Sequence, residues 1–263
     1  MQVTNNKTEG PREYLEWKLI AAWMEVPVEE AQRKWQALEL VAQARYHEIL
    51  TKLRAGYPLD YLLPVTQILD KQFRLRPGVL IPRPETEELI TLIQATPDKP
   101  STVVDVGCGS GLIGICLSAE FARVLMLDIS LEALQITRQN IELNKTPNTS
   151  VTRSDLLADL PRIQGDWWLV ANLPYVPAGD KEHESEYRTT HEPDLAIYSG
   201  ADGLDLFRRL VAQLQELAHP PRRIFFELDP RNIHTAQELL RESGDWSPKI
   251  LQDLAGRDRF LIA

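Results

Sequence analysis

The stretch TVVDVGCGSGL at residues 102–112 joins a short β-branched run to a glycine-rich turn and to the start of a helical segment. Glycines at such a turn let the backbone pass close to a ligand, and the amides of the helix N-terminus lie beside it. The next apolar run ends on Asp128, about twenty residues beyond the turn, where a carboxylate can accept hydrogen bonds from ribose hydroxyls. The turn and Asp128 together predict a site for a nucleoside-containing cofactor.

Short apolar runs alternate with segments of helical periodicity throughout the chain downstream of Ser101. This alternation is typical of an α/β fold with a doubly wound, mostly parallel sheet. We expect strands at residues 102–106, 123–128, 150–153, 167–171, 222–228 and 259–262, and helices near 112–119, 131–144, 203–218 and 230–242.

The first part of the chain has a different pattern. From Pro11 to about Gly56 the apolar residues recur at helical spacing, which indicates two or more amphipathic helices, the second opening at Pro27. Between Tyr57 and Pro84 the period shortens to two and includes the run Val79-Leu80-Ile81, with a turn expected at Asp70-Lys71. We interpret this part as a helical unit, either a structural cap or a docking module, followed by a β-hairpin that links two domains.

Composition limits the possible functions. The net charge of −9 weakens any expectation of binding long nucleic acid through phosphates and favours a protein partner or a small substrate. Neither a long apolar stretch nor a signal-like N-terminus is visible, so we expect a cytoplasmic protein without a membrane partner. We also expect it to work as a monomer. The two cysteines, Cys108 and Cys116, lack the company of a metal-ligand cluster, and we expect free thiols and no metal.

Two further carboxylates favour S-adenosyl-L-methionine over a nicotinamide cofactor. Asp105 opens the glycine turn, where it could meet the cationic methionine moiety, or serve only as a helix cap. Asp155 follows the third strand, where it could accept from the adenine amine, or belong only to a solvated turn. Gly114, in the following helix, is expected to be a close-packing position.

A candidate catalytic motif, Asn172-Leu173-Pro174-Tyr175, follows the strand expected at residues 167–171. An asparagine oxygen and a neighbouring main-chain carbonyl held by proline can accept both hydrogens of an NH₂ group, while a tyrosine ring packs on its flat face. Orientation of a delocalised nitrogen lone pair toward a methyl group then requires no strong base. The same residues also form a good turn sequence, so the motif gains its meaning from the glycine turn and Asp128 before it.

These residues resemble those of the PrmC/HemK family, the release factor glutamine methyltransferases. The resemblance covers nearly the whole chain. It includes the segment LIPRPETE at residues 80–87, the segment HEPDLA at 191–196, and the ending DLAGRDRF at 253–260. The segment at 80–87 is the most specific, because generic methyltransferases lack it.

The resemblance implies an N-terminal helical domain that engages the release factor (residues 1–62), a β-hairpin linker (63–83) and a Rossmann-like class I methyltransferase domain (84–263). It implies methyl transfer from S-adenosyl-L-methionine to the glutamine of a Gly-Gly-Gln motif. Carried over by motif, the cofactor would be held by Gly107, Cys108, Gly109, Ser110, Gly111 and Asp128, with Leu156 beside the adenine and Asn172 near the reacting group. The glutamine amide would be held by Asn172, Leu173, Pro174 and Tyr175, above a pocket floor shaped by residues 83–87, including Arg83, Glu85 and Thr86.

Two departures from the family pattern are visible. Leu173 replaces the first of two usual prolines, which makes the motif similar to that of ribosomal RNA adenine dimethyltransferases. The usual Glu-Ile-Gly near the fifth strand is Glu227-Leu228-Asp229, a difference that we expect to be peripheral. Two alternatives therefore stay open: an adenine-amine methyltransferase acting on RNA or DNA, and a non-catalytic cofactor-binding relative.

Overall fold

The computed structural model describes residues 11–24, 28, 31, 40–182 and 191–263. The chain divides into two compact units, Met1–Thr66 and Gln67–Ala263. The division falls a little beyond residue 62, the end that the sequence suggested for the helical domain. Within the described part, none of the helices has both the length and the apolar character required to cross a membrane.

The first unit is helical in its described part. It contains α1 (Pro11–Met24), α3 (Leu40–Arg54) and the short α4 (Leu59–Leu62). Pro27, where the sequence predicted the start of a second helix, lies outside the described residues. The unit has a core of its own, made of Leu19, Ile20, Ala21, Ala31, Leu50, Leu62 and Leu63.

A two-stranded hairpin follows, formed by β1 (Thr66–Ile68) and β2 (Lys71–Phe73). Asn144 holds β2 from the side, since its Oδ1 accepts from the amide of Gln72 and its Nδ2 donates to the carbonyl of the same residue. The run at residues 79–81, expected to continue the strand pattern, is irregular instead. Gly78 precedes it with a φ of +107°, which interrupts the strand, and Val79 is buried without being part of a ladder.

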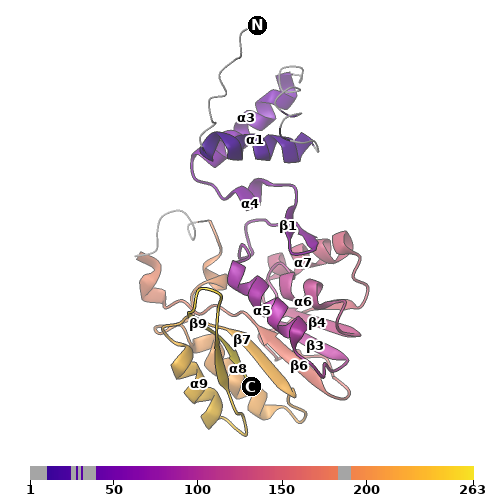
Figure 1. Ribbon diagram of the computed structural model, residues 1–263, viewed down its shortest axis with the longest axis vertical. Coiled ribbons are helices and arrows are strands. Elements are labelled where there is room, and N and C mark those ends of the chain that lie inside the picture. The colour runs from indigo at the N-terminus through magenta and orange to yellow at the C-terminus, as the bar shows by residue number, and fades with distance from the viewer. Residues whose placement is uncertain (1–10, 25–27, 29–30, 32–39, 183–190) are drawn as a thin grey trace. The chain divides into compact units, whose positions relative to one another are not determined.

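The second unit is built on a seven-stranded sheet with the order β5-β4-β3-β6-β7-β9-β8 (Figure 1). The first five strands in this order are parallel, and β9 runs antiparallel between β7 and β8. The expected doubly wound α/β class is confirmed. The strands are β3 (Thr102–Val106), β4 (Arg123–Asp128), β5 (Thr149–Arg153), β6 (Trp167–Ala171), β7 (Arg223–Glu227), β8 (Lys249–Gln252) and β9 (Asp258–Ile262).

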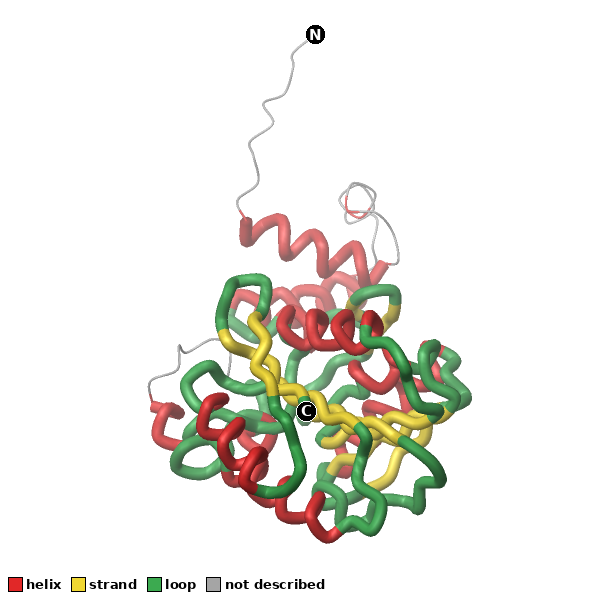
Figure 2. The backbone as a smooth tube through the Cα atoms, turned by 60° about the horizontal axis from the view of Figure 1, so that its bottom comes forward, coloured by secondary structure: helices red, strands yellow, loops and turns green. Residues whose placement is uncertain are grey.

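Helices cover both faces of this sheet (Figure 2). One face packs on α8 (Asp205–Glu216) and α9 (Ile233–Glu242), whose apolar residues share a core cluster with Leu125 and Leu127 of β4. The opposite face carries α5 (Pro84–Ala95), α6 (Leu112–Leu117) and α7 (Leu131–Asn144). A Cβ on Gly114 of α6 would lie 2.5 Å from the sulfur of Met126, which confirms the expected close-packing role of this glycine. Two short 3₁₀ helices, Ala178–Glu182 and Asp194–Ala196, lie in the connection between β6 and α8.

Candidate active site

A cavity of about 290 Å³ opens where the parallel strands end. Its wall takes residues from the turns after β3, β4, β5 and β6, which must meet at one edge because these strands run in the same direction. Such an edge is the usual ligand site of a doubly wound sheet. The wall is completed by residues from α5, α6, α7 and α8 and from two connecting segments: Thr86, Leu112, Ile113, Glu132, Ala133, Leu206, Arg209, Gly78, Val79, Leu80, Pro82, Pro193, Leu195 and Ala196.

The glycine turn after β3 lies on this wall, as expected, from Gly107 to Ser110. The amides of Gly107 and Cys108 donate to the carbonyl of Leu127, at 2.8 and 3.0 Å, which ties the turn to β4. Gly109 has a φ of +55°, and a Cβ on it would meet nothing within 4 Å, so the turn leaves open space there for a ligand. Gly111 is not part of the wall; it precedes α6 with a φ of +82°.

Asp128 ends β4 on the cavity wall. Its Oδ2 accepts from the amide of Gly109 at 2.9 Å and its Oδ1 accepts from the amide of Ser130 at 2.8 Å. Burial raises the pKa of this carboxyl from its ordinary value, against the lowering effect of the backbone hydrogen bonds. Each oxygen keeps a second lone pair, so the side chain can still accept from ribose hydroxyls.

Asp105 lies beneath the turn and not on the cavity wall. It is fully buried, and its Oδ2 accepts from the amide of Gly114 at 3.0 Å. Its Oδ1 has no hydrogen-bond partner among the described residues. Burial raises its pKa to about 7, and the charge of Asp128 adds to the effect. A cation in the cavity would favour the ionised form of this carboxyl.

The far end of the cavity is formed by the residues that follow β5. Leu156 lies on the wall in a left-handed conformation, with a φ of +57°. Asp155 is also on the wall, but its carboxylate forms an ion pair with Arg209 of α8 at 2.6 Å. Arg209 could not be predicted from the sequence, because Asp155 lies 54 residues away from it. An adenine amine that donates to the carboxylate of Asp155 would therefore compete with the guanidinium of Arg209.

Asn172, Leu173 and Pro174 line the cavity after β6. The Nδ2 of Asn172 donates to the hydroxyl of Thr86 at 3.0 Å, which engages the nitrogen side of the carboxamide. Leu173 is buried, and a Cβ on Gly107 would lie 2.8 Å from one of its methyl groups. The side chain of Leu173, which replaces the usual proline, therefore has room because Gly107 has no Cβ.

Tyr175 does not form part of the wall, and the packing of its ring on a substrate amide stays a prediction. Its hydroxyl donates to Oε1 of Glu227 at 3.1 Å, and its carbonyl accepts from Nδ2 of Asn232 at 2.9 Å. Burial raises the pKa of its hydroxyl far above the ordinary value. Glu227 is the residue of Glu227-Leu228-Asp229 that keeps the family pattern, and it also accepts from the hydroxyl of Thr86 at 2.8 Å. That the differences at Leu228 and Asp229 are peripheral stays a prediction.

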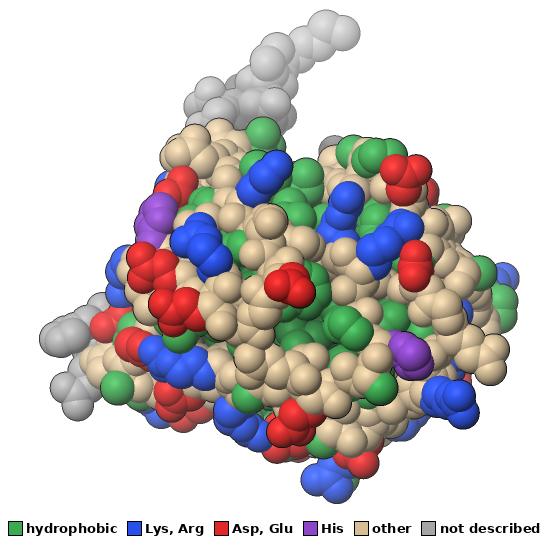
Figure 3. Space-filling model, turned by 90° about the horizontal axis from the view of Figure 1, so that it is seen from below, with side chains coloured by type: hydrophobic (Ala, Val, Ile, Leu, Met, Phe, Trp, Pro, Cys, Tyr) green, Lys and Arg blue, Asp and Glu red, His purple; other side chains and the backbone are tan. Residues whose placement is uncertain are grey.

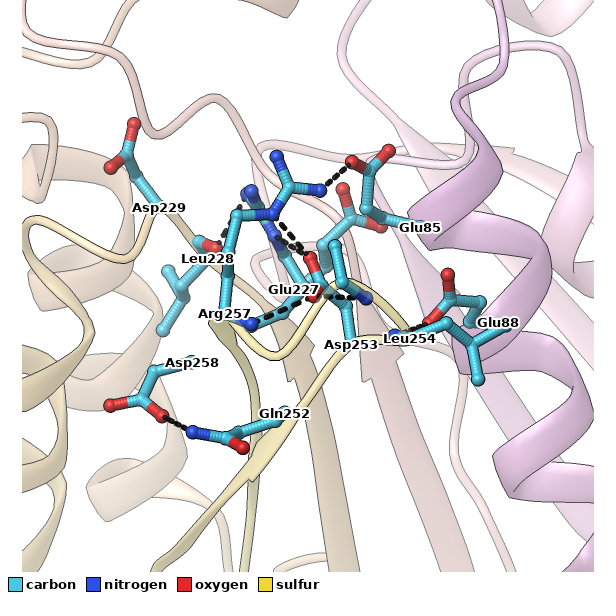
Figure 4. A network of polar contacts seen from close by, with 12 residues as sticks. Glu85, Glu88, Glu227, Leu228, Asp229, Gln252, Asp253, Leu254, Arg257 and Asp258 are labelled. Carbon is cyan, nitrogen blue, oxygen red and sulfur yellow. Dashed lines mark hydrogen bonds and ion pairs between the residues drawn. The ribbon is translucent and has the colours of Figure 1, made fainter.

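Of the segment 83–87, only Thr86 reaches the cavity wall. Arg83 forms an ion pair with Glu192 at 2.6 Å, and the other oxygen of Glu192 accepts from the amide of Ile81 at 2.7 Å. Glu85 pairs with Arg257 at 2.6 Å in the network of Figure 4. Arg83 and Glu85 therefore hold together segments that are distant in the sequence. The pocket floor that the family resemblance implied for residues 83–87 stays a prediction.

The site fits S-adenosyl-L-methionine on three observations. Open space lies over Gly109, a carboxylate with free lone pairs stands at Asp128, and an unpartnered buried oxygen of Asp105 favours a cation. Cys108 and Ser110 line the same space. Both cysteines of the chain are buried free thiols, as expected.

Comparison with known proteins gives consistent results. Residues 85–189 match the family described as the methyltransferase small domain. The chain is 36% identical over 228 residues to a release factor glutamine methyltransferase of Deinococcus radiodurans, with 84% of this chain and 80% of the relative covered. It is 33% identical over 235 residues to the enzyme of the same name from Moorella thermoacetica, with 87% and 82% covered.

Solved structures support the fold. A methyltransferase from Pyrococcus furiosus matches with a TM-score of 0.53 and 15% identity, over 84% of this chain and 96% of the other. The T. thermophilus 16S rRNA N2 G1207 methyltransferase, in complex with AdoMet and guanosine, matches with a TM-score of 0.56 and 20% identity, over 76% and 49%. Both sequence relatives are at least 33% identical to this chain, and each match covers at least 80% of the two proteins compared. The chain therefore belongs to the release factor glutamine methyltransferase family.

Proposed function

We propose that this methyltransferase transfers a methyl group to the side-chain amide nitrogen of the glutamine in the Gly-Gly-Gln motif of peptide-chain release factors. Its methyl donor is S-adenosyl-L-methionine, which supplies an electrophilic methyl group when bound. The observation that carries the proposal is the carboxamide of Asn172 on the cavity wall. Its nitrogen is engaged by Thr86, so its oxygen is left to accept from a substrate NH₂ group.

The residues of the motif would act by holding the amide in place. Oδ1 of Asn172 and the main-chain carbonyl of Leu173 would accept its two hydrogens, and Pro174 limits the freedom of the chain that carries them. An amide lone pair is delocalised, and these contacts would turn it toward the methyl donor. No base is needed, because the proton can leave after the methyl group has been transferred.

We expect Asn172→Ala to lower kcat about 10²- to 10³-fold, because the lost oxygen acts on the reacting nitrogen. The Kd for S-adenosyl-L-methionine should change little. Steady-state kinetics and calorimetry measure the two effects separately. Equal losses in kcat and cofactor affinity would assign Asn172 to the cofactor instead.

The reaction is tested by mass spectrometry of a purified bacterial release factor after incubation with this protein and S-adenosyl-L-methionine. We expect one added methyl group, located on the glutamine of Gly-Gly-Gln. A release factor carrying glutamate at that position is the matched control and should gain none. An unmodified glutamine, with cofactor binding shown by calorimetry, would refute the proposed acceptor.

The adenine-amine alternative rests on Leu173 and predicts a basic surface for nucleic acid. On the face of the molecule seen in Figure 3, acidic and basic side chains are interspersed and do not form one continuous basic area. An oligonucleotide containing adenine, offered in the same assay, separates the two acceptors. A cofactor-binding protein without activity would modify neither the glutamine nor the adenine.

The proposal extends to the partners of the enzyme. Residues 1–62 would dock the release factor and residues 63–83 would link this module to the methyltransferase domain at 84–263. The enzyme would act as a monomer in the cytoplasm on a protein substrate, without direct contact to nucleic acid. Light scattering of the purified chain tests the oligomeric state.

A further inference from the structure

Glu227 ends β7 and is connected to Asn172 through a single side chain. Thr86 donates its hydroxyl proton to Oε2 of Glu227 at 2.8 Å, and the same hydroxyl oxygen accepts from Nδ2 of Asn172 at 3.0 Å. Tyr175 donates to the other oxygen of Glu227 at 3.1 Å. Glu227 and Thr86 are only 1% and 4% exposed, so water does not replace these partners. The chain of bonds joins β7, α5 and the motif after β6.

The direction of every bond in this chain follows from the charge of Glu227. An ionised carboxylate only accepts, and a threonine hydroxyl has one proton to donate. Once this proton is given to Glu227, the hydroxyl of Thr86 can offer only a lone pair to Asn172. The carboxamide must then turn its NH₂ group toward Thr86 and its oxygen the other way.

We propose that Glu227 is a positioning residue, which acts through Thr86 to hold the oxygen of Asn172 toward the substrate. This inference rests on the proposed function, since the oxygen matters only if a substrate NH₂ group is bound there. Glu227 does not line the cavity and does not touch the reacting atoms. Tyr175 supports it by occupying the second carboxylate oxygen.

The surroundings of Glu227 are charged on several sides. Figure 4 shows it with Glu85 of α5 and with Asp253 and Arg257 of the turn between β8 and β9. Arg259 of β9 attracts its negative charge, whereas Glu85 repels it, and Asp229 lies two residues along the chain. Desolvation raises the pKa of Glu227 to about 7, and hydrogen bonds from Thr86 and Tyr175 oppose this rise. The group is therefore ionised above neutral pH.

The substitution Glu227→Gln preserves the shape and reverses the bonding. Glutamine leaves one acceptor oxygen for two hydroxyl donors, and among the described residues the hydroxyl of Tyr175 has no other acceptor, so Tyr175 keeps this oxygen. The new NH₂ group then donates to Thr86, the proton of Thr86 goes to Asn172, and the carboxamide of Asn172 presents NH₂ to the cavity. We expect kcat to fall about 10²-fold or more, while KM for S-adenosyl-L-methionine changes little. Glu88→Gln is the matched control, because Glu88 is partly buried on α5, accepts from the amide of Leu254 and does not line the cavity, so this variant should leave kcat unchanged.

A readout without substrate separates this inference from the proposed function. In ¹⁵N-labelled protein, the side-chain NH₂ signals of Asn172, assigned by their loss in Asn172→Asp, should exchange slowly with water because they face Thr86. In Glu227→Gln they should exchange several-fold faster. Thr86→Ser keeps the hydroxyl and should keep the slow exchange, whereas Thr86→Val should lose it.

Failure of the proposed function and failure of the positioning role of Glu227 give different results. A wild-type enzyme that leaves the release factor glutamine unmodified would refute the proposed function. Unchanged exchange of the Asn172 amide in Glu227→Gln would overturn the positioning role, whatever the activity. Unchanged kcat in this variant, with an active wild type, would overturn it as well.

Discussion

Asp128 serves two purposes at once, because its carboxylate holds the amides of Gly109 and Ser130 and faces the cavity. We expect Asp128→Ala to weaken binding of S-adenosyl-L-methionine by about 1 to 3 kcal/mol, through lost ribose contacts and a loosened turn. Asp128→Asn keeps one of the two acceptor oxygens, so this variant should lose less affinity for S-adenosyl-L-methionine than Asp128→Ala. Calorimetry measures both affinities, and an unchanged Kd in the alanine variant would remove Asp128 from the site.

Burial of two carboxyls makes stability and activity depend on pH in opposite ways. The pKa values of Asp105 and Glu227 are raised to about 7 in the folded protein, from ordinary values of 3.8 and 4.5. Between these limits the unfolded chain binds fewer protons than the folded one, so the free energy of unfolding falls as the pH rises. Methyl transfer should increase over the same window, because Glu227 ionises.

Thermal unfolding of the cofactor-free protein between about pH 5 and pH 8 tests this dependence. Glu227→Gln removes one of the two groups, so its stability should fall less steeply with pH than that of the wild type. Identical slopes for the two proteins would show that Glu227 does not titrate in this range.

At the scale of elements, the ion pair between Arg83 and Glu192 joins the N-terminus of α5 to the segment that precedes α8. Glu192 is completely buried at its side chain and binds both Arg83 and the amide of Ile81, and Pro82 and Pro193 beside this pair line the cavity. We expect Glu192→Gln to lower the free energy of unfolding by about 1 to 3 kcal/mol and to raise KM for the cofactor, because the cavity wall loosens.

The exposed pair between Lys181 and Asp194 provides the control for this prediction. Both side chains are more than half exposed, so Asp194→Asn should change stability by less than about 0.5 kcal/mol. Denaturant unfolding and steady-state kinetics report the two effects. If Glu192→Gln lowers the free energy of unfolding no more than Asp194→Asn does, the buried pair does not stabilise the protein more than the exposed one.

Several elements could be predicted well from the sequence. The expected bounds of β3, β4, β6 and α7 agree with the structure, since buried parallel strands and a capped amphipathic helix have strong local patterns. The edge strand β8 was missed because three of its four residues are exposed. The helix α5 was missed because its first residues, PETE, were interpreted only as a motif.

The site residues divide in the same way. Gly107 and Asn172 directly follow strands and Asp128 is the last residue of one, and a strand end is visible in the sequence. The roles of Thr86 and Glu227 depend on a hydrogen bond between residues 141 positions apart, and no local pattern reports such a contact. The partner of Asp155 was hidden for the same reason. Strand ends can therefore be predicted from one sequence, whereas the side chains that support them cannot.

At the scale of the whole molecule, the two compact units have separate cores. The cluster of the first unit uses residues 19–63, and the large cluster of the second uses residues 104–261, with no residue in common. Among the residues that the structure describes, those that line the cavity all lie from Gly78 onward. Cofactor binding should therefore depend on the second unit alone, while the proposed docking of the release factor should depend on the first.

A chain that begins at residue 64 keeps the hairpin β1–β2 and tests this division of labour. We expect it to bind S-adenosyl-L-methionine with the affinity of the full chain, and its KM for the release factor to rise at least about tenfold, which corresponds to about 1.4 kcal/mol of lost docking energy. At saturating release factor its kcat should be preserved, because every residue on the cavity wall is retained. Thermal unfolding with and without cofactor shows whether the shortened chain is folded. An unchanged KM would mean that the helical unit is a structural cap and that the release factor is recognised by the methyltransferase domain itself.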